Sequence, residues 1–250
     1  SILIVSAITF FVMNIIPGGP FNKEKATSAE AQKVLEERYN LDKPIPEQYV
    51  IYMNNLLHGD WGVSLHSGRD IWGEISSRFK ISAKLGGMAA LVAIVAGLVL
   101  GSIAALTRNH WPDRLIVFFT TLGTAMPSFV LATLLLLVFC LKLGWFPVGQ
   151  MKTAGVPLNG IEKFGDYLWH MFLPVLTVVI LSIGSRMRMT RTNMLEVLNS
   201  DYIRTARAKG LSERTVIYKH AFKNTLIPLV TSLAGLVPGL FSGAMITESV

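Results

Sequence analysis

Long apolar blocks without any Asp, Glu, Lys or Arg restrict what this chain can fold into. A helix needs about 20 residues to cross about 30 Å of hydrocarbon. Four blocks have that length and the first is shorter. The blocks are Ser1 to Ile16, Leu85 to Thr107, Leu115 to Leu141, Tyr167 to Ser185 and Thr225 to Thr247. They predict an all-α, polytopic integral membrane protein with five spans at about 1–16, 85–107, 115–141, 167–185 and 225–247.

The composition agrees with a single transmembrane domain over residues 1–250. Hydrophobic residues make up 51% of the chain and charged residues 16%, whereas about a quarter of the residues in soluble domains are charged. The first block lacks the basic residues that normally flank an opening span, and the last block ends close to Val250. We therefore expect one further span beyond this sequence, six in all.

Basic residues are unevenly distributed among the connections. Arg108 and Arg114 lie between the second and third blocks, and nine basic residues lie between Arg186 and Lys223, against three in 142–166. Because cytoplasmic loops carry an excess of Lys and Arg, the start of the chain and residues 186–224 are predicted to be cytoplasmic. Residues 17–84 contain nine basic and nine acidic residues. Because loops of this length translocate regardless of their charge, we predict that they form an extracytoplasmic segment.

The extracytoplasmic segment shows helix signals. Thr27 and Glu30 have the spacing of a capping box, and Pro46 and Gly59 bracket a second stretch of helical pattern. The pattern predicts small surface helices, which either pack on the membrane face or bind an external partner.

The stretch from Asn199 to Pro228 is too polar for the membrane, but it has helical patterning. Asp201 favours a helix N-terminus, and Gly210 supplies the left-handed residue that commonly ends a helix. Ser212 and Glu213 then start a second helix. Such a cationic element could lie on anionic membrane lipid. A helix broken at a glycine is better suited to protrude and insert into a groove on a partner protein.

The chain also carries motifs of a known family along nearly its whole length. They are "DYIRTARAKGLSERTV" followed by "HAFKNTLIPLVT", and, earlier in the chain, "IPGGPF", "LDKPIPEQY", "GDWGVSL", "SAKLG", "PSFV" and "RMTRTNMLEVL". In these motifs the chain resembles the peptide class of ABC-importer permeases, the inner-membrane components of binding-protein-dependent transport. Within that class it is most similar to the B-type permeases of oligopeptide importers.

The resemblance implies that the broken helix is a coupling helix that inserts into a cleft on an ATPase subunit. Gly210 matches the family's glycine, whereas Arg204, Thr205 and Ala206 stand where permeases in general have Glu-Ala-Ala. The implied ATPase-coupling residues are Asp201, Tyr202, Arg204, Thr205, Ala206, Arg207, Lys209, Gly210, Leu211, Ser212, His220 and Asn224. No residue is assigned to the substrate path.

The resemblance further implies the partners, the cargo and the location. The expected partners are a homologous sister permease, two ATPase subunits that carry ATP and Mg at the cytoplasmic face, and an extracytoplasmic peptide-binding protein. The cargo would be oligopeptides, with dipeptides, nickel or another small solute as alternatives. The location would be the bacterial cytoplasmic (inner) membrane.

The residues themselves bear on the energy source. No block contains Asp, Glu, Lys or Arg, whereas proton- and sodium-coupled carriers usually place such groups near mid-membrane. The chain has no Gly-Lys dipeptide and therefore no Walker-type phosphate loop. We expect a transport subunit that is not an enzyme, binds no cofactor and depends on another polypeptide for ATP hydrolysis.

Other classes of function are disfavoured. An intramembrane hydrolase would need His170 as base and Ser182, Ser185 or Ser242 as nucleophile, yet no acidic partner lies within a block. A channel would need a charged ring or carbonyl filter, and neither is visible. The single Cys140 and the five histidines show no metal-ligand spacing, so no metal site is expected. No nucleic-acid partner is expected either.

Small residues recur every four positions in two blocks. They are Ala93, Gly97, Gly101 and Ala105 in the second block, and Gly235, Gly239 and Gly243 in the last. Such ridges let membrane helices approach closely. Pro238 beside Gly239 further predicts a kink or hinge in the last block.

Overall fold

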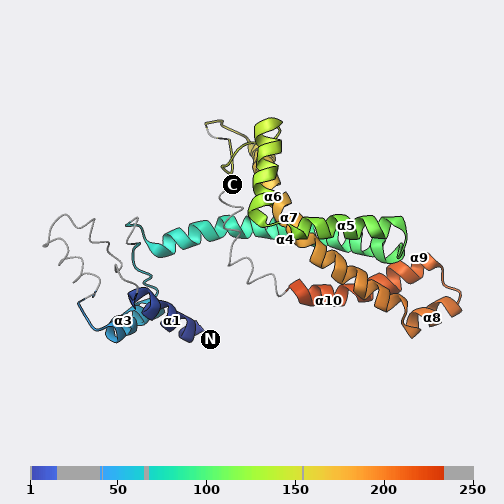
Figure 1. Cartoon of the computed structure of the whole chain (residues 1–250), viewed down its shortest axis with the longest axis horizontal. Coiled ribbons are helices and arrows are strands. Elements are labelled where there is room, and N and C mark those ends of the chain that lie inside the picture. The colour runs from blue at the N-terminus through green and yellow to red at the C-terminus, as the bar shows by residue number, and fades with distance from the viewer. Residues whose placement is uncertain (1, 16–39, 41, 65–67, 154, 234–250) are drawn as a thin grey trace. The chain divides into compact units, whose positions relative to one another are not determined.

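The computed structural model of the chain describes residues 2–15, 40, 42–64, 68–153 and 155–233 (Figure 1). These residues form helices, and their only strand-like pairing is an isolated bridge between Val63 and Asp70. The helices are α1 (Ile2–Ile15), α3 (Ile45–Leu57), α4 (Ile71–Leu106), α5 (Trp111–Ala125), α6 (Ser128–Leu135), the π-helix η2 (Leu136–Lys142), α7 (Gly160–Leu198), α8 (Asp201–Ala208), α9 (Glu213–Thr215), the π-helix η3 (Val216–Phe222) and α10 (Lys223–Leu233). The all-α prediction is confirmed. The chain divides into two compact units, residues 1–78 and 79–250.

In the first unit, α1 packs against α3 through aromatic side chains. The ring of Phe10 lies 5.4 Å from that of Tyr49 and 5.6 Å from that of Tyr52, and the hydroxyls of Ser6 and Tyr49 are 3.0 Å apart. The helix predicted between Pro46 and Gly59 is confirmed as α3. The expected helix start at Thr27 and Glu30 lies outside the described residues.

Within the part of the chain that the structure describes, two helices are long and apolar enough to cross a membrane, and a third crossing depends on a bent pair. The two are α4 and α7, and the pair is α5 with α6 and η2, bent by 102°. Helix α1 is apolar but shorter. The last predicted span is described only as far as Leu233, so its glycine ridge and Pro238 lie outside the described residues. The span count of five stays a prediction.

The block Leu115 to Leu141, expected as one continuous span, is divided in the structure. Helix α5 ends at Ala125 and α6 begins at Ser128, after Met126 and Pro127. The backbone of Met126 is extended, at φ −81° and ψ 137°, because the ring of a following proline disfavours helical geometry. The proline therefore separates two helical pieces that run in different directions.

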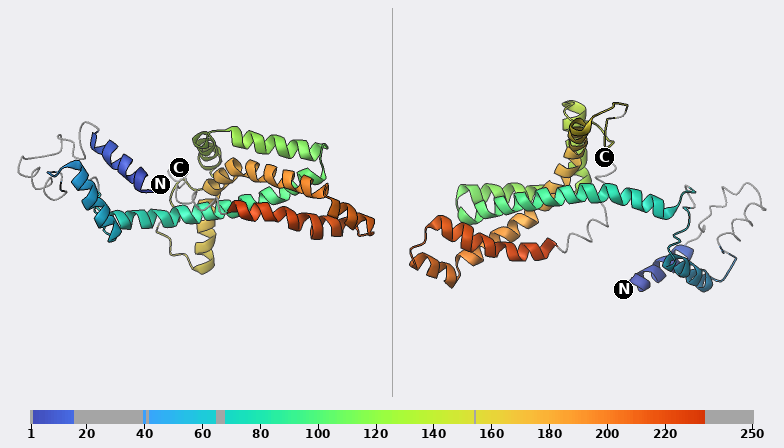
Figure 2. Two further views of the ribbon diagram at one scale, coloured as in Figure 1. Left: turned by 90° about the horizontal axis from the view of Figure 1, so that it is seen from below. Right: turned by 180° about the vertical axis from the view of Figure 1, so that it is seen from behind.

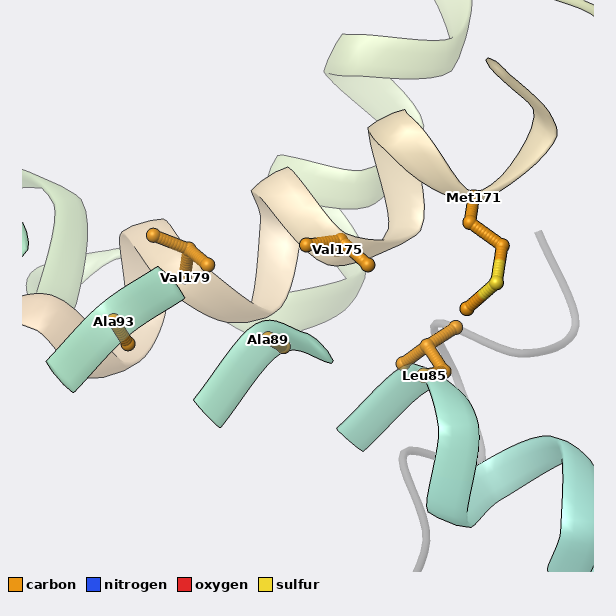
Figure 3. Packing of buried hydrophobic residues seen from close by; sticks show 6 residues of the cluster. All are labelled: Leu85, Ala89, Ala93, Met171, Val175 and Val179. Carbon is orange, nitrogen blue, oxygen red and sulfur yellow. The ribbon is translucent and has the colours of Figure 1, made fainter. Parts of the chain in front are cut away.

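Helices α4 and α7 form a tightly packed pair in the second unit. Figure 3 shows Leu85, Ala89 and Ala93 of α4 facing Met171, Val175 and Val179 of α7. Both sets have a spacing of four residues, which places each on a single helix face. Residue numbers increase in the same direction along both helices, so α4 and α7 run parallel.

Glycines bring these two helices into close approach. A Cβ atom at Gly97 would lie 2.8 Å from Cβ of Arg186, and one at Gly101 would lie 2.5 Å from Cβ of Thr190. Real Cβ atoms do not approach other atoms so closely, and only glycine fits at these positions. The ridge predicted in the second block is thus confirmed as a contact surface: Ala93, Gly97, Gly101 and Ala105 are all buried.

Helix α5 packs against α7 in the opposite direction. A Cβ atom at Gly123 would lie 2.8 Å from Cγ2 of Ile180, whereas one at Gly184, further along α7, would lie 2.8 Å from the backbone oxygen of Thr120, which comes earlier in α5. The relative directions of α4, α5 and α7 agree with consecutive spans that alternate across a membrane.

A bidentate ion pair joins the beginning of α5 to α7. The guanidinium of Arg191 donates from Nε to Oδ1 of Asp113 at 2.7 Å and from Nη2 to Oδ2 at 2.8 Å. The same carboxylate accepts the backbone N–H of Asn109, a turn residue at φ +67°. Asp113 is buried, and its charge is compensated because all of these donors point at it. The pair was not predicted from the sequence.

We predict that Gly101→Ala lowers the melting temperature of the purified protein. The added methyl group would meet Thr190 and the backbone oxygen of Met187, and overpacking of this kind costs about 1–3 kcal/mol. Gly87→Ala, on the same helix with nothing within 4 Å of its Cβ position, is the matched control and should leave stability unchanged or raised. Equal effects of both substitutions would contradict the packing described here.

Candidate functional site

The candidate site lies where α7 gives way to α8. Helix α7 continues from the apolar block, which ends at Ser185, as far as Leu198. These 13 residues extend the helix by about 20 Å beyond the block. In Figure 1, α8 and α9 lie together past this end of α7. The region 186–224 therefore begins as a rigid extension of a predicted span.

The chain turns sharply between α8 and α9, and local hydrogen bonds define the turn. The N–H of Leu211 donates to the carbonyl of Ala206 at 3.4 Å, and that of Gly210 to Arg207 at 2.9 Å. Together with φ +75° at Gly210, these two bonds form a Schellman motif. The hydroxyl of Ser212 then accepts the N–H of Thr215 and caps α9. The predicted sequence of helix, glycine corner and helix is confirmed.

An apolar cluster attaches this corner to the ends of the long helices. Ile203 and Ala206 are the buried residues of α8, and they pack with Val216 and Ala221 of η3. The cluster is completed by Met194 of α7 and Ala105 of α4. Ile203, Val216, Ala221 and Met194 have no exposed surface. We call these six residues the corner cluster.

Helix α10 strengthens the attachment. It returns along the second half of α7 (Figure 2). The buried hydroxyl of Thr225 donates to the carbonyl of Ala221 at 2.9 Å and lies 3.3 Å from Sδ of Met194. The corner is therefore held from both sides, by α7 before it and by α10 after it.

Two polar contacts span the corner on its outer side. The guanidinium of Arg207 donates from Nε to Glu213 at 2.7 Å and from Nη2 at 3.3 Å, which joins the last turn of α8 to α9. The side-chain amide of Asn224 donates to the hydroxyl of Tyr202 at 3.0 Å. Both contacts are exposed, and exposed ion pairs contribute less than about 1 kcal/mol. They orient the helices rather than hold the corner together.

The structure separates the sequence-predicted site residues into two groups. Ala206 is buried in the corner cluster, and His220 and Asn224 are half-buried on η3 and α10. The exposed group comprises Asp201, Tyr202, Arg204, Thr205, Arg207, Lys209, Gly210, Leu211 and Ser212. Most of the predicted residues thus lie on the outer surface of one corner.

Sequence reasoning missed the residues that anchor the corner. Ile203, Val216 and Ala221 are not in the predicted set, although their apolar character among charged neighbours was a visible signal. The alignment of Val216 with Ala221 depends on η3, a π-helix in which successive residues turn through a smaller angle than in an α-helix. A search for α-helical periodicity does not find this register.

An intramembrane hydrolase would need His170 to act as base for Ser182, Ser185 or Ser242. The geometry of α7 excludes the first two of these three pairs. His170 and Ser182 lie on the same helix, twelve residues and therefore about 18 Å apart along its axis; Ser185 lies farther still. The hydroxyl of Ser185 donates to the carbonyl of Ser182 at 2.9 Å. A base and its nucleophile must be within hydrogen-bond reach, so His170 cannot activate either serine. Ser242 lies outside the described residues.

Comparisons with known proteins agree with the resemblance noted from the motifs. Residues 97–250 match a family model described as the inner membrane component of binding-protein-dependent transport systems, and residues 1–86 match the model of its N-terminal part. The chain is 38% identical to the dipeptide transport system permease protein DppB of Bacillus subtilis, over the whole chain and 77% of the relative. It is also 38% identical to the oligopeptide transport system permease protein OppB of Haemophilus influenzae, over 78% of that protein. The glutathione transport system permease protein GsiC of Escherichia coli is 35% identical, again over the whole chain and 78% of the relative.

We predict that Ile203→Ala loosens the corner. Truncation of a fully buried isoleucine costs about 2–5 kcal/mol, and Ile203→Val only about 0.5–1.5 kcal/mol. Limited trypsin digestion should cut faster after Arg204, Arg207 and Lys209 in Ile203→Ala, and only slightly faster in Ile203→Val. Leu211→Ala, at an exposed position of the same corner, should digest like the unaltered protein. Unchanged digestion of Ile203→Ala would mean that the corner cluster does not hold α8.

Proposed function

This chain belongs to the family of inner-membrane components of binding-protein-dependent transport systems, and we propose that it is the permease subunit of an ATP-driven importer that carries peptides. Its location is the bacterial cytoplasmic membrane. The chain is a transport subunit rather than an enzyme, and separate ATPase subunits supply the energy. The single observation that carries this proposal is the match of the whole chain to peptide permeases at 38% identity.

The corner formed by α8, Gly210 and α9 is the proposed contact with an ATPase subunit. Its exposed face carries Asp201, Arg204 and Lys209, charged groups suited to a polar cleft on a partner protein. A helix lying flat on lipid would instead turn an apolar face outward. In α8 the apolar residues Ile203 and Ala206 face the protein, which favours a protein partner over the lipid surface.

Attachment through the corner cluster supports a mechanical role. A displacement of α8 by a closing ATPase would reach α7 through Met194 and α4 through Ala105. Packed interiors resist compression, so the long helices would move with the corner. The glycine contacts between α4 and α7 would keep that pair together during the movement.

Within the corner the predicted coupling residues divide into two roles. Arg207 is engaged by Glu213, and Tyr202 is engaged by Asn224, so these residues set the angle between the helices. Asp201, Arg204, Thr205 and Lys209 are exposed and are proposed for direct contact with the ATPase. Arg204 and Asp201 pair with each other at 3.6 Å on this surface, an exposed contact that a partner protein can replace. Ala206 supports the corner from inside.

Oligopeptides are the proposed cargo. The relatives are named for dipeptide, oligopeptide and glutathione transport, all of which are peptides. Among the alternatives weighed from the sequence, these names favour dipeptides over nickel. A difference in peptide length would be decided together with the extracytoplasmic binding protein.

The proposed assembly contains a homologous sister permease, two ATPase subunits and an extracytoplasmic peptide-binding protein. The ATPase subunits hold ATP and Mg, and this chain binds no cofactor. The proposed orientation puts the start of the chain and the corner in the cytoplasm. Membrane lipid surrounds the exposed apolar faces of the spans.

We predict that Gly210→Val uncouples the importer. Valine resists the left-handed conformation observed at Gly210, at a cost of roughly 1–2 kcal/mol, whereas asparagine adopts it readily. The complete importer, purified and reconstituted, should hydrolyse ATP faster with peptide and binding protein present. Gly210→Val should lose that stimulation, and Gly210→Asn, the matched control, should retain it. Full peptide uptake by Gly210→Val would refute a coupling role for the corner, and absence of any peptide stimulation in the unaltered importer would refute the proposed function.

A second prediction concerns orientation, and it rests on the uneven distribution of basic residues. Single cysteines at positions 152 and 209, in a Cys140→Ser background, should label from opposite sides of intact cells. A membrane-impermeant thiol reagent should reach position 152 from outside and position 209 only after the cells are opened. Labelling of position 209 from outside would reverse the proposed topology.

A further inference from the structure

A cavity of about 230 Å³ lies in the second unit, at the end of the helices opposite the corner. Its walls come from α4, α6, η2, α7 and the connection before α7. In the proposed orientation, this end faces the extracytoplasmic side, where cargo arrives. The cavity is therefore built by several elements brought together by the fold, and it lies far from the ATPase contact.

The walls are largely apolar, and among the described residues none of the lining side chains is Asp, Glu, Lys or Arg. Leu85, Leu136, Phe146 and Met171 are among the apolar lining residues. The polar members are neutral or already engaged. The Nδ1 atom of His170 is 2.8 Å from the carbonyl oxygen of Asp166, and the hydroxyl of Thr177 donates to the carbonyl of Leu173 at 2.9 Å. A charged group placed against the apolar walls would lose its hydration, and the ring of His170 already lies 3.4 Å from the carboxylate of Asp166.

Stacked aromatic rings and a pair of hydrogen bonds hold the rim of the cavity in place. Phe146 stacks on Trp169 with ring centroids 4.4 Å apart and on Phe172 at 4.9 Å. Asp166 accepts the N–H of Thr153 at 2.9 Å and its hydroxyl at 2.6 Å. These contacts shape the connection over the cavity, so the pocket is formed before any ligand enters.

From these observations we infer that this cavity is a binding site for one uncharged apolar side chain of the transported peptide, such as leucine or phenylalanine. The inference rests on the proposed function. Volume supports it, because an apolar cavity of about 150 Å³ already holds benzene. The uncharged walls would disfavour lysine, arginine, aspartate and glutamate side chains, and the apolar surface would gain little from glycine or serine.

The test is to fill the cavity without disturbing its surroundings. Ala132 is a buried cavity wall residue on α6, and Ala132→Leu would occupy part of the space. Thr133→Leu, at an exposed neighbouring position on the same helix, is the matched control. The complete importer is reconstituted in liposomes and given two labelled peptides of equal length and equal affinity for the binding protein. One peptide contains leucine and phenylalanine, and the other contains glycine and serine.

We expect Ala132→Leu to lower uptake of the apolar peptide about tenfold relative to the small-residue peptide, with no change in Thr133→Leu. Equal uptake ratios in Ala132→Leu and the unaltered importer would overturn the inference. An equal loss of both peptides would overturn it too. If the unaltered importer took up neither peptide, the proposed function itself would have failed.

A second measurement needs no substitution in the cavity. Cys140 is the only cysteine of the chain, and it lies in the cavity wall with its thiol 3.4 Å from the carbonyl of Pro147. Modification of this chain by a small methanethiosulfonate reagent, followed by mass spectrometry during turnover, should be slowed by the apolar peptide but not by the small-residue peptide. Protection that does not depend on the peptide, as from a lipid chain that occupies the cavity permanently, would overturn the inference.

Discussion

Close contact of α4 and α5 with α7 is the constraint on which the rest of the second unit depends. Glycines at 97 and 101 let α4 approach α7 from one side, and those at 123 and 184 let α5 and α7 approach each other. In a membrane there is no hydrophobic driving force between helices, so association relies on such close van der Waals packing. Helix α7 thereby becomes a central element whose two ends carry different structures. One end helps to line the cavity under the aromatic rim, and the other carries the corner.

The continuity of α7 has a functional consequence. The part of α7 that follows Pro174 extends about 20 Å beyond the apolar block, and it transmits force along its axis because bending it would break backbone hydrogen bonds. The corner is fastened to that extension by the buried residues of α8 and η3 rather than by its exposed ion pairs. Buried apolar contacts keep their strength in salt, whereas exposed ion pairs are screened. Attachment through buried apolar contacts therefore suits a corner that is proposed to transmit movement between α7 and an ATPase subunit.

Charged residues lie outside the apolar blocks of this protein, and the buried ones that the structure describes are paired. The apolar blocks contain none, and the buried pair of Asp113 and Arg191 lies just outside them. Each partner compensates the other, which removes the large cost of an isolated buried ion. The pair holds the start of α5 against α7 a few residues before the corner cluster. At the opposite end of the helices, the uncharged cavity offers a site where selectivity can come from exclusion of charge instead of attraction.

The sequence by itself determined the features that depend on neighbouring residues. Membrane character followed from the uncharged blocks, and the corner followed from Asp201, Gly210 and Ser212, because helix caps are made by residues a few positions apart. Only the tertiary structure decided which faces meet. The pairing of Asp113 with Arg191 joins residues 78 positions apart, and the burial of Ala206 depends on η3 and on the ends of α4 and α7. The bend after Ala125 had a local signal in Pro127, but the direction taken by α6 depends on its packing against α7. The cavity is lined by five segments, several of them distant from one another in the sequence. It could not be predicted from the sequence, because local patterns contain no information on how distant segments pack.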